Sequence, residues 1–133
     1  MRMQNIFTSA IVSLIGLAAI STGAHAGFCS SYEQTSSNAG HCPTCQLNVK
    51  SWPREQAYTV FASNGWQAEL NYAGGDSSVA FGGGTWRQGL GHAYAGKSFD
   101  IDLSQQGRTL SMIMSTMMNG QRQVIRATFR CTG

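Results

Sequence analysis

The sequence has few charged side chains. Lysine and arginine together number nine and aspartate and glutamate six among 133 residues, which gives a formal net charge of +3. A charge this small does not support nucleic-acid binding. Glycine and serine are abundant instead, with 16 glycines, and this composition is typical of exported all-β domains with many tight turns.

Beyond residue 26 the sequence also lacks any apolar run long enough to span a membrane. The one long apolar run, Ile6 to Ile20, follows the positive charge of Arg2 and precedes Ala24-His25-Ala26. These three regions match a secretory signal peptide that is cleaved after Ala26. We therefore expect residues 1–26 to be removed and residues 27–133 to act in the periplasm or outside the cell. Their eight basic and six acidic side chains leave a net charge of +2.

All four cysteines lie in this expected mature chain. An even number of cysteines in an oxidising compartment predicts two disulfides, and three pairings are possible. We favour Cys29–Cys42 and Cys45–Cys131, because Cys45 opens one predicted strand and Cys131 closes the last, so that their bond would lock a closed sheet. An exchange of Cys42 and Cys45 between these partners is an open alternative.

The segment Cys42-Pro43-Thr44-Cys45 also has the spacing of a redox pair. Such pairs sit at the start of a helix that follows a buried strand, whereas here polar residues precede the pair and a strand-like alternation follows it. A zinc site would need a second ligand pair at similar spacing, and none is present. A thiol oxidoreductase that uses Cys42 and Cys45 is one alternative function. If these two cysteines bond to each other, they become the leading candidate for an active site.

Apolar and polar residues alternate along several short segments, and no segment has a convincing helical period. Asn64-Gly65 and Asn119-Gly120 are strong hairpin signals. The pattern predicts an all-β fold, a small antiparallel β-barrel or β-sandwich of about seven or eight strands, in residues 45–133. Residues 27–44 are expected to form a disulfide-tethered loop. The predicted strands include residues 46–51, 58–63, 66–72, 77–81, 98–103, 109–116 and 121–131.

The glycine-dense segment 82–97 departs from this alternation. A long loop on a rigid sheet is a common place for binding, and glycines allow close approach of a partner. We expect this segment to contact another protein, with Trp86 as the buried anchor and with Arg87 and Lys97 providing charge complementarity. Trp86→Ala is then expected to abolish binding without loss of stability. The alternative is that Trp86 closes one end of the barrel. The candidate binding residues are Trp86, Arg87, His92, Tyr94 and Lys97.

Four methionines cluster near the predicted hairpin at Asn119-Gly120: Met112, Met114, Met117 and Met118. Thioethers are soft ligands that favour Cu(I). Met112 and Met114 share a strand face, and with His92 nearby the chain loosely resembles periplasmic copper chaperones. Core packing beside Leu110 is the simpler explanation of the same pattern. A periplasmic copper-binding protein is therefore the other alternative function, whereas the favoured function needs no cofactor.

The last predicted strand has two different faces. Ile125, Ala127, Phe129 and Cys131 lie on one face, and three arginines lie on the other. Two aspartates on the strand at 98–103 have the phase to share the outer surface, so we expect a solvated cross-strand charge network. An acidic partner is the alternative use of the arginines. The charged residues concerned are Arg122, Arg126, Arg130, Asp100 and Asp102.

No nucleophile motif accompanies His92, so we expect no enzyme. In its layout, an exported domain of this size with an antiparallel barrel and a disulfide that reaches the last strand, the chain resembles the periplasmic lysozyme inhibitors. Residues 76–80 and 86–97 approximate the Ser-rich loop and the Trp- and Lys-bearing segment of that family. The resemblance covers the chain from Cys45 onward and implies a protein inhibitor, but no residue role is carried over, since fold does not imply function. We predict an exported, non-catalytic binding protein of the cell envelope.

Overall fold

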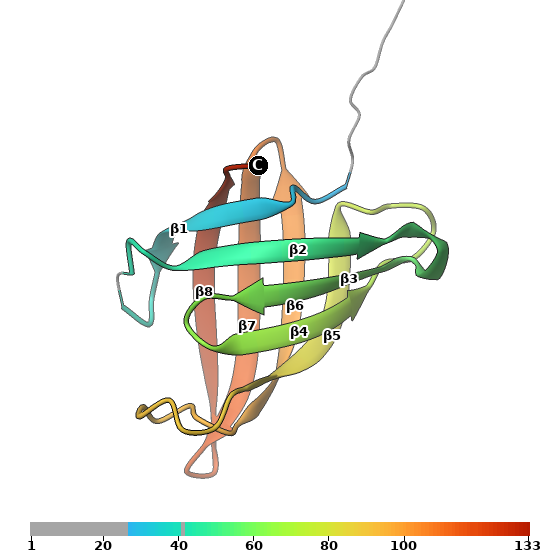
Figure 1. The fold of residues 1–133 in the computed structure, drawn as a ribbon. Helices are drawn as coiled ribbons and strands as arrows, with labels where there is room; N and C mark the ends of the chain where they lie inside the picture. Colours follow the sequence, from blue (N-terminus) through green and yellow to red (C-terminus); the bar gives the residue numbers. More distant parts are fainter. Residues whose placement is uncertain (1–26, 41) are drawn as a thin grey trace, which may run out of the picture.

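The strands of this protein pair in the order in which they follow one another along the chain. The computed structural model describes residues 27–40 and 42–133, so the expected signal peptide, residues 1–26, and His41 lie outside the described residues. Eight antiparallel strands form one closed barrel, in which the last strand pairs with the first (Figure 1). The all-β prediction is confirmed. Of the two predicted architectures, β-barrel and β-sandwich, the structure has the barrel. Within the described part of the chain, no helix has the length and hydropathy needed to cross a membrane.

Tight turns connect several of the strands. Asn119 and Gly120 have positive φ angles of 52° and 78° and form the two-residue turn of the last hairpin, as the Asn-Gly pair predicts. A 3-10 turn, η1 Pro53–Glu55, lies between the second and third strands. In chain order the strands are β1 Ser31–Ser37, β2 Gln46–Trp52, β3 Ala57–Ala62, β4 Trp66–Asn71, β5 Val79–Trp86, β6 Ser98–Gln106, β7 Thr109–Met118 and β8 Gln121–Cys131.

The barrel consists of two layers whose strands cross steeply. In Figure 1, β2, β3 and β4 run across the front, and β6, β7 and β8 run nearly perpendicular to them behind. Strand β5 joins the layers, because it pairs with β4 on one side and with β6 on the other. At this corner a Cβ atom on Gly82 would lie 1.9 Å from the carbonyl oxygen of Glu69, and one on Gly84 would lie 2.0 Å from that of Gln67. Glycine is therefore required where the sheet folds over.

Strand β1 forms the second corner. It pairs with β2 only from Ser31 to Glu33, whereas its pairing with β8 continues to Ser37 through a bulge between Gln34 and Ser36. A bulge bends a strand, which allows β1 to leave the front layer and join the back layer. The expectation that residues 27–44 are only a loop is therefore wrong. The hydroxyl groups of this polar strand find partners on β8, because Thr35 and Ser36 each lie 2.7 Å from the hydroxyl of Thr128.

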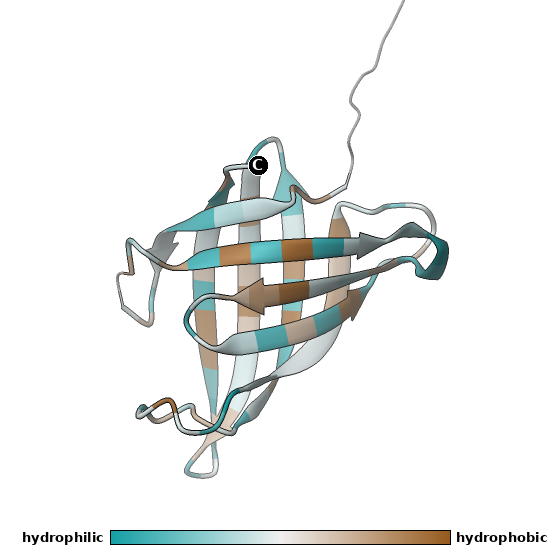
Figure 2. Ribbon diagram, viewed as in Figure 1, coloured by the Kyte–Doolittle hydropathy of each residue, from teal (hydrophilic) through white to brown (hydrophobic). Residues whose placement is uncertain are grey.

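Inward-facing side chains from both layers fill the barrel. Figure 2 shows apolar and polar residues alternating along the front strands, as expected for sheets with one buried and one solvated face. On β8, Ile125, Ala127 and Phe129 are buried while their neighbours on the strand are mostly exposed, which confirms the face predicted for this strand. The largest fully buried side chains are Tyr32, Leu47, Val60, Leu70, Ile101, Leu103, Leu110 and Met114.

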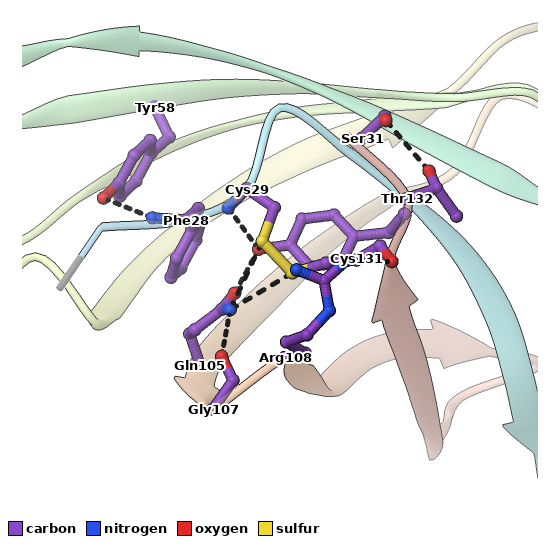
Figure 3. The surroundings of a disulfide bond; sticks show 10 residues. Phe28, Cys29, Ser31, Tyr58, Gln105, Gly107, Arg108, Cys131 and Thr132 are labelled. Carbon is purple, nitrogen blue, oxygen red and sulfur yellow. Dashed lines mark hydrogen bonds between the residues drawn. A yellow bond between two sulfur atoms is a disulfide. The ribbon is translucent and has the colours of Figure 1, made fainter. Parts of the chain in front are cut away.

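The two disulfides differ from the pairing that we favoured. Cys29 is bonded to Cys131 and Cys42 to Cys45, with Cα atoms 5.8 Å and 5.4 Å apart. Strand β1 explains the difference, because it lies between β2 and β8 and places Cys29 beside the end of β8, where Cys131 is opposite Tyr32. A bond that locks the closed sheet is present, but Cys29 rather than Cys45 provides it (Figure 3).

Tyr32 organises the same end of the barrel, where Figure 3 shows Cys29 and Gln105 close together. Its side chain is fully buried, and its hydroxyl accepts a hydrogen bond from the backbone N–H of Cys29 at 2.7 Å and donates one to the side-chain oxygen of Gln105. The Gln105 amide donates in turn to the carbonyl oxygen of Gly107 at 2.7 Å. Burial raises the pKa of Tyr32 to about 12, because a buried phenolate would lose its hydration. The neutral form of Tyr32 is therefore part of the folded structure.

The outer face of the back layer does not carry the predicted charge network. Among residues 27–40 and 42–133, the one ion pair joins Arg130 of β8 to Glu33 of β1. Asp102 lies opposite Ile113, and Ile113 lies opposite Arg126. Strand β7 therefore separates the acidic positions on β6 from the basic positions on β8, and Asp100, Asp102, Arg122 and Arg126 form no ion pair with any residue that the structure describes.

Removal of the two disulfides is expected to have unequal effects on stability. The Cys29–Cys131 bond spans 102 residues of sequence and the Cys42–Cys45 bond spans 3. In the chain-entropy model these loops correspond to about 5 and about 2 kcal/mol of stabilisation. The double variant Cys29→Ser/Cys131→Ser should therefore lose more free energy of unfolding than Cys42→Ser/Cys45→Ser when both are unfolded in urea. Equal losses would contradict the assignment of the closing bond to Cys29–Cys131.

The folded protein is expected to lose stability at alkaline pH through Tyr32. Its pKa is raised from 10.0 to about 12 on folding, so the stabilisation from its protonated form is complete below about pH 10 and is lost as the pH rises through about 12. In an absorbance titration, Tyr32→Phe should remove the tyrosine that ionises last and leave the other three of the four tyrosines. Ionisation of all four tyrosines together near pH 10 would show this expectation to be wrong.

Candidate binding site

Three of the four loops at the end of the barrel away from Cys29–Cys131 border a cavity. They are residues 38–45 between β1 and β2, the turn 63–65 between β3 and β4, and residues 87–97 between β5 and β6. Between them a cavity of about 340 Å³, here called the mouth cavity, reaches into the barrel. Leu47 and Trp66 of the front layer and Ile125 and Phe129 of the back layer form part of its wall.

The loop 87–97 is shorter than the segment 82–97 that we expected, because residues 82–86 belong to β5. Main-chain hydrogen bonds hold both ends of this loop: the N–H of Trp86 donates to the carbonyl oxygen of Lys97 at 2.8 Å, and that of Arg87 donates to Gly65 at 2.9 Å. The side chain of Leu90 packs on Gly65 so closely that a Cβ atom there would lie 2.6 Å from Leu90 Cδ1. The loop is therefore anchored to the β3–β4 turn.

An aromatic cluster lies where this loop meets the barrel. Trp86 ends β5 and is only 7% exposed. Tyr94 stacks on its indole ring with centroids 5.5 Å apart, and His92 approaches the ring edge-on at 5.2 Å. Trp66 lies opposite Trp86 in the strand register and meets Phe99 edge-on at 5.6 Å. The side chains of Trp66, Trp86, His92 and Tyr94 all line the mouth cavity.

The structure brings together only part of the predicted binding set. Trp86, His92 and Tyr94 are gathered at the mouth cavity, whereas Arg87 and Lys97 do not line it. Arg87 is exposed, and Lys97 holds the loop through its main chain. Because Trp86 is buried and its ring lies edge-on to Phe99, we now expect Trp86→Ala to cost about 3–5 kcal/mol of stability. The expectation from the sequence that this variant keeps its stability disagrees with the burial of Trp86.

Two of the four methionines also line the mouth cavity. Met112 and Met114 are buried beside Leu110 on the inner face of β7 and share the cavity wall with His92. Met117 is 56% exposed, and neither it nor Met118 lines the cavity. Cu(I) binding by Met112, Met114 and His92 stays a prediction.

The cysteine pair that the sequence indicated as a possible redox site also lies at the mouth cavity. Both cysteines of the Cys42–Cys45 disulfide line the mouth cavity. Cys42 is half-buried and Cys45 is buried, and the carbonyl oxygen of Cys45 accepts a hydrogen bond from the N–H of Gln34 at 2.9 Å. Gln34 lines the cavity too. It could not be predicted as a wall residue, because its segment lacks the apolar alternation of a strand.

The wall of the mouth cavity contains no Asp, Glu, Lys or Arg among the described residues that line it. Its polar groups make short local contacts: His92 Nδ1 accepts from the N–H of Tyr94 at 3.2 Å, and the Ser37 hydroxyl accepts from the N–H of Ala39 at 3.0 Å. Two buried donors, the indole nitrogen Nε1 of Trp86 and the amide nitrogen Nε2 of Gln34, have no hydrogen-bond partner among residues 27–40 and 42–133. Buried polar atoms are nearly always paired in folded proteins, so these two are unusual.

Comparison with known proteins finds no matching family model, no matching curated protein and no matching solved structure. The resemblance in layout to the periplasmic lysozyme inhibitors therefore stays a prediction.

Proposed function

We propose that this protein is an exported, non-catalytic binding protein that holds a small ligand in the mouth cavity. The observation that carries the proposal is the cavity itself, about 340 Å³ in volume and walled by aromatic and aliphatic side chains. Concave, mostly apolar sites with a few polar groups are the usual form of small-molecule sites, and the mouths of β-barrels are among their common locations. The closed barrel provides a rigid frame for such a site.

The shape of the site favours a small ligand over the protein partner that we expected first. A stable protein–protein interface buries roughly 800 Å² on each partner and relies on exposed aromatic and arginine anchors. Here the predicted anchor, Trp86, is inside the barrel. A protein could reach it only by inserting a side chain into the mouth cavity. The inhibitor role inferred from layout would then require such an insertion.

The contacts of the wall residues support binding rather than catalysis. The two cavity-lining groups that most resemble a nucleophile and a base, the Ser37 hydroxyl and the His92 imidazole, bond to the backbone of their own loops. Nucleophilic catalysis needs a nucleophile and a base within hydrogen-bond reach of each other. The structure pairs neither group in this way.

The proposal predicts saturable binding of a neutral apolar fluorophore. N-phenyl-1-naphthylamine should gain fluorescence on addition of the protein as it leaves water for the cavity. Ile125 faces the cavity from β8, and its replacement by tryptophan should fill part of the space and weaken binding about tenfold or more. The measurement is a fluorescence titration of the oxidised protein, with circular dichroism to confirm folding.

Ile113 provides the matched control. It lies on the neighbouring strand β7 but is 39% exposed on the outer face, so Ile113→Trp should leave the affinity within about twofold. An equal loss in both variants, or no saturable binding by the wild-type protein, would contradict binding in the mouth cavity.

A second candidate function is thiol–disulfide exchange at Cys42–Cys45. One observation favours it: these cysteines bond to each other, with Cys42 partly accessible and Cys45 buried beside an apolar cavity. A substrate thiolate would attack Cys42 Sγ and release Cys45 as a thiolate. A second substrate thiol would then displace Cys42, so that the substrate is oxidised and both cysteines are reduced. Against it, no helix begins at Cys42 to stabilise a thiolate there.

The reduction potential of the Cys42–Cys45 bond separates the two candidates. Catalytic disulfides have potentials of about −120 to −270 mV, whereas structural ones lie below about −300 mV. We expect a structural value, measured by alkylation and mass spectrometry after equilibration in dithiothreitol redox buffers. Cys29–Cys131 in the same molecule is the internal reference. A potential for Cys42–Cys45 in the catalytic range would favour the exchange reaction instead.

A further inference from the structure

The chemistry of the mouth cavity narrows the class of ligand it takes. Trp86 Nε1 and Gln34 Nε2 belong to cavity-lining residues, are buried and have no hydrogen-bond partner in the described part of the chain. An unmade hydrogen bond on a buried donor costs free energy that a suitable acceptor restores. Both residues lie on corner strands of the barrel, Trp86 on β5 and Gln34 on β1. The scaffold therefore holds the two donors in place.

The side chains that carry the two donors differ in the ligand groups to which they can hydrogen-bond. An indole N–H can only donate, so a group that satisfies Trp86 must be an acceptor. The Gln34 amide has both an acceptor oxygen and donor N–H groups, so it can adapt to either kind of group. Trp86 therefore requires a hydrogen-bond acceptor on the ligand. Gln34 can bond to either a donor or an acceptor at a second polar atom of the ligand.

The rest of the wall limits charge, shape and size. No carboxylate, ammonium or guanidinium group lines the cavity within the part of the chain that the structure describes. A charged ligand would lose hydration there without gaining an ionic partner. Indole and phenol rings favour a flat aromatic ligand through offset or edge-on contacts. A volume of about 340 Å³ is at the small end for ligand pockets and suits one or two fused rings.

We propose that the mouth cavity binds a neutral aromatic molecule of one or two rings whose carbonyl-type oxygen accepts a hydrogen bond from the indole N–H of Trp86. This inference rests on the proposed function and specifies its ligand class. Tyr94 stacks on the indole and His92 meets it edge-on, and both belong to the loop 87–97. His92 is exposed and Tyr94 is half-buried, so each has room to move outward.

The test compares two probes that differ at the proposed acceptor, 2-acetylnaphthalene and 2-ethylnaphthalene. Their affinities for wild-type protein, Trp86→Phe and Trp52→Phe are measured by equilibrium dialysis. Trp86→Phe keeps an aromatic ring in the wall but removes the N–H donor. The ratio of ketone affinity to hydrocarbon affinity should fall about tenfold in this variant. The ratio removes the contribution of general apolar burial, which both probes share.

Trp52→Phe is the matched control. Trp52 is 42% exposed, does not line the mouth cavity and donates its indole N–H to the hydroxyl of Thr59 at 3.0 Å. The same chemical change at this outer position should leave the ratio unchanged within about twofold. The anionic probe 2-naphthoate should bind at least about tenfold more weakly than the ketone.

A second measurement does not depend on the folding of any variant. The chain has three tryptophans, so the ¹⁵N-labelled wild-type protein gives three indole N–H signals. Nuclear Overhauser contacts between Trp86 and the Tyr94 ring stacked on it identify the Trp86 signal without any variant. The Trp86 proton should move downfield when the ketone is added and stay near its original position when the hydrocarbon is added. The Trp52 signal should respond to neither probe.

The possible results separate this inference from the function on which it rests. Binding of both probes with an unchanged ratio in Trp86→Phe, or no selective shift of the Trp86 signal, would overturn the ligand class but leave cavity binding intact. Tighter binding of 2-naphthoate than of the ketone would overturn the requirement for a neutral ligand. Binding of none of the probes by the wild-type protein would overturn both proposals.

Discussion

The pairing of β1 with β8 is the contact on which the rest of the structure depends. Without it the sheet would have two open edges, whose unpaired N–H and carbonyl groups invite association with other chains. The pairing runs from Tyr32 opposite Cys131 to Ser37 opposite Ala127. The Cys29–Cys131 disulfide and the hydrogen bonds of buried Tyr32 fix one end of it. The barrel is thus closed covalently and non-covalently at the same place.

Closure also creates the site at the opposite end. Strand β1 serves as a corner, so it leaves β2 after Glu33 and follows β8. The loop 38–45 connects β1 to β2 at this end, and its residues Ala39, Gly40, Cys42 and Cys45 line the mouth cavity. At the other corner, Gly82 and Gly84 let β5 pass close to β4 and deliver Trp86 to the same cavity. The two corners therefore supply Gln34 and Trp86, whose buried nitrogen donors have no partner within residues 27–40 and 42–133.

The two ends of the barrel differ in how well their polar groups are satisfied. At the closed end the Tyr32 hydroxyl, the Gln105 amide and the carbonyl of Gly107 form a continuous hydrogen-bonded chain. At the mouth, buried donors remain unpaired and aromatic rings from a loop cover a tryptophan. Departures from full satisfaction are expected where a protein trades stability for function. This contrast locates the candidate site independently of the cavity.

Several elements of this fold were predictable from local pattern, because they depend on neighbouring residues. The alternation along β6, β7 and β8 identified their inner faces, and the Asn119-Gly120 pair identified a hairpin. The glycine-dense segment pointed to Trp86, His92 and Tyr94, which all line the mouth cavity. Strand β1 was not predicted, because its sequence SYEQTSS is almost entirely polar. Its strand conformation depends on partners about ninety residues away, such as Thr128.

The sequence by itself determined the all-β class, the strand faces and the presence of two disulfides, because periodicity, turn chemistry and cysteine count are local properties. Only the tertiary structure decided which cysteines meet, that β1 closes the barrel, and that Gln34 and Trp86 line one cavity. Each of these depends on segments distant in the chain being brought together by sheet closure. A local pattern carries no information about that closure until the register of all eight strands is set.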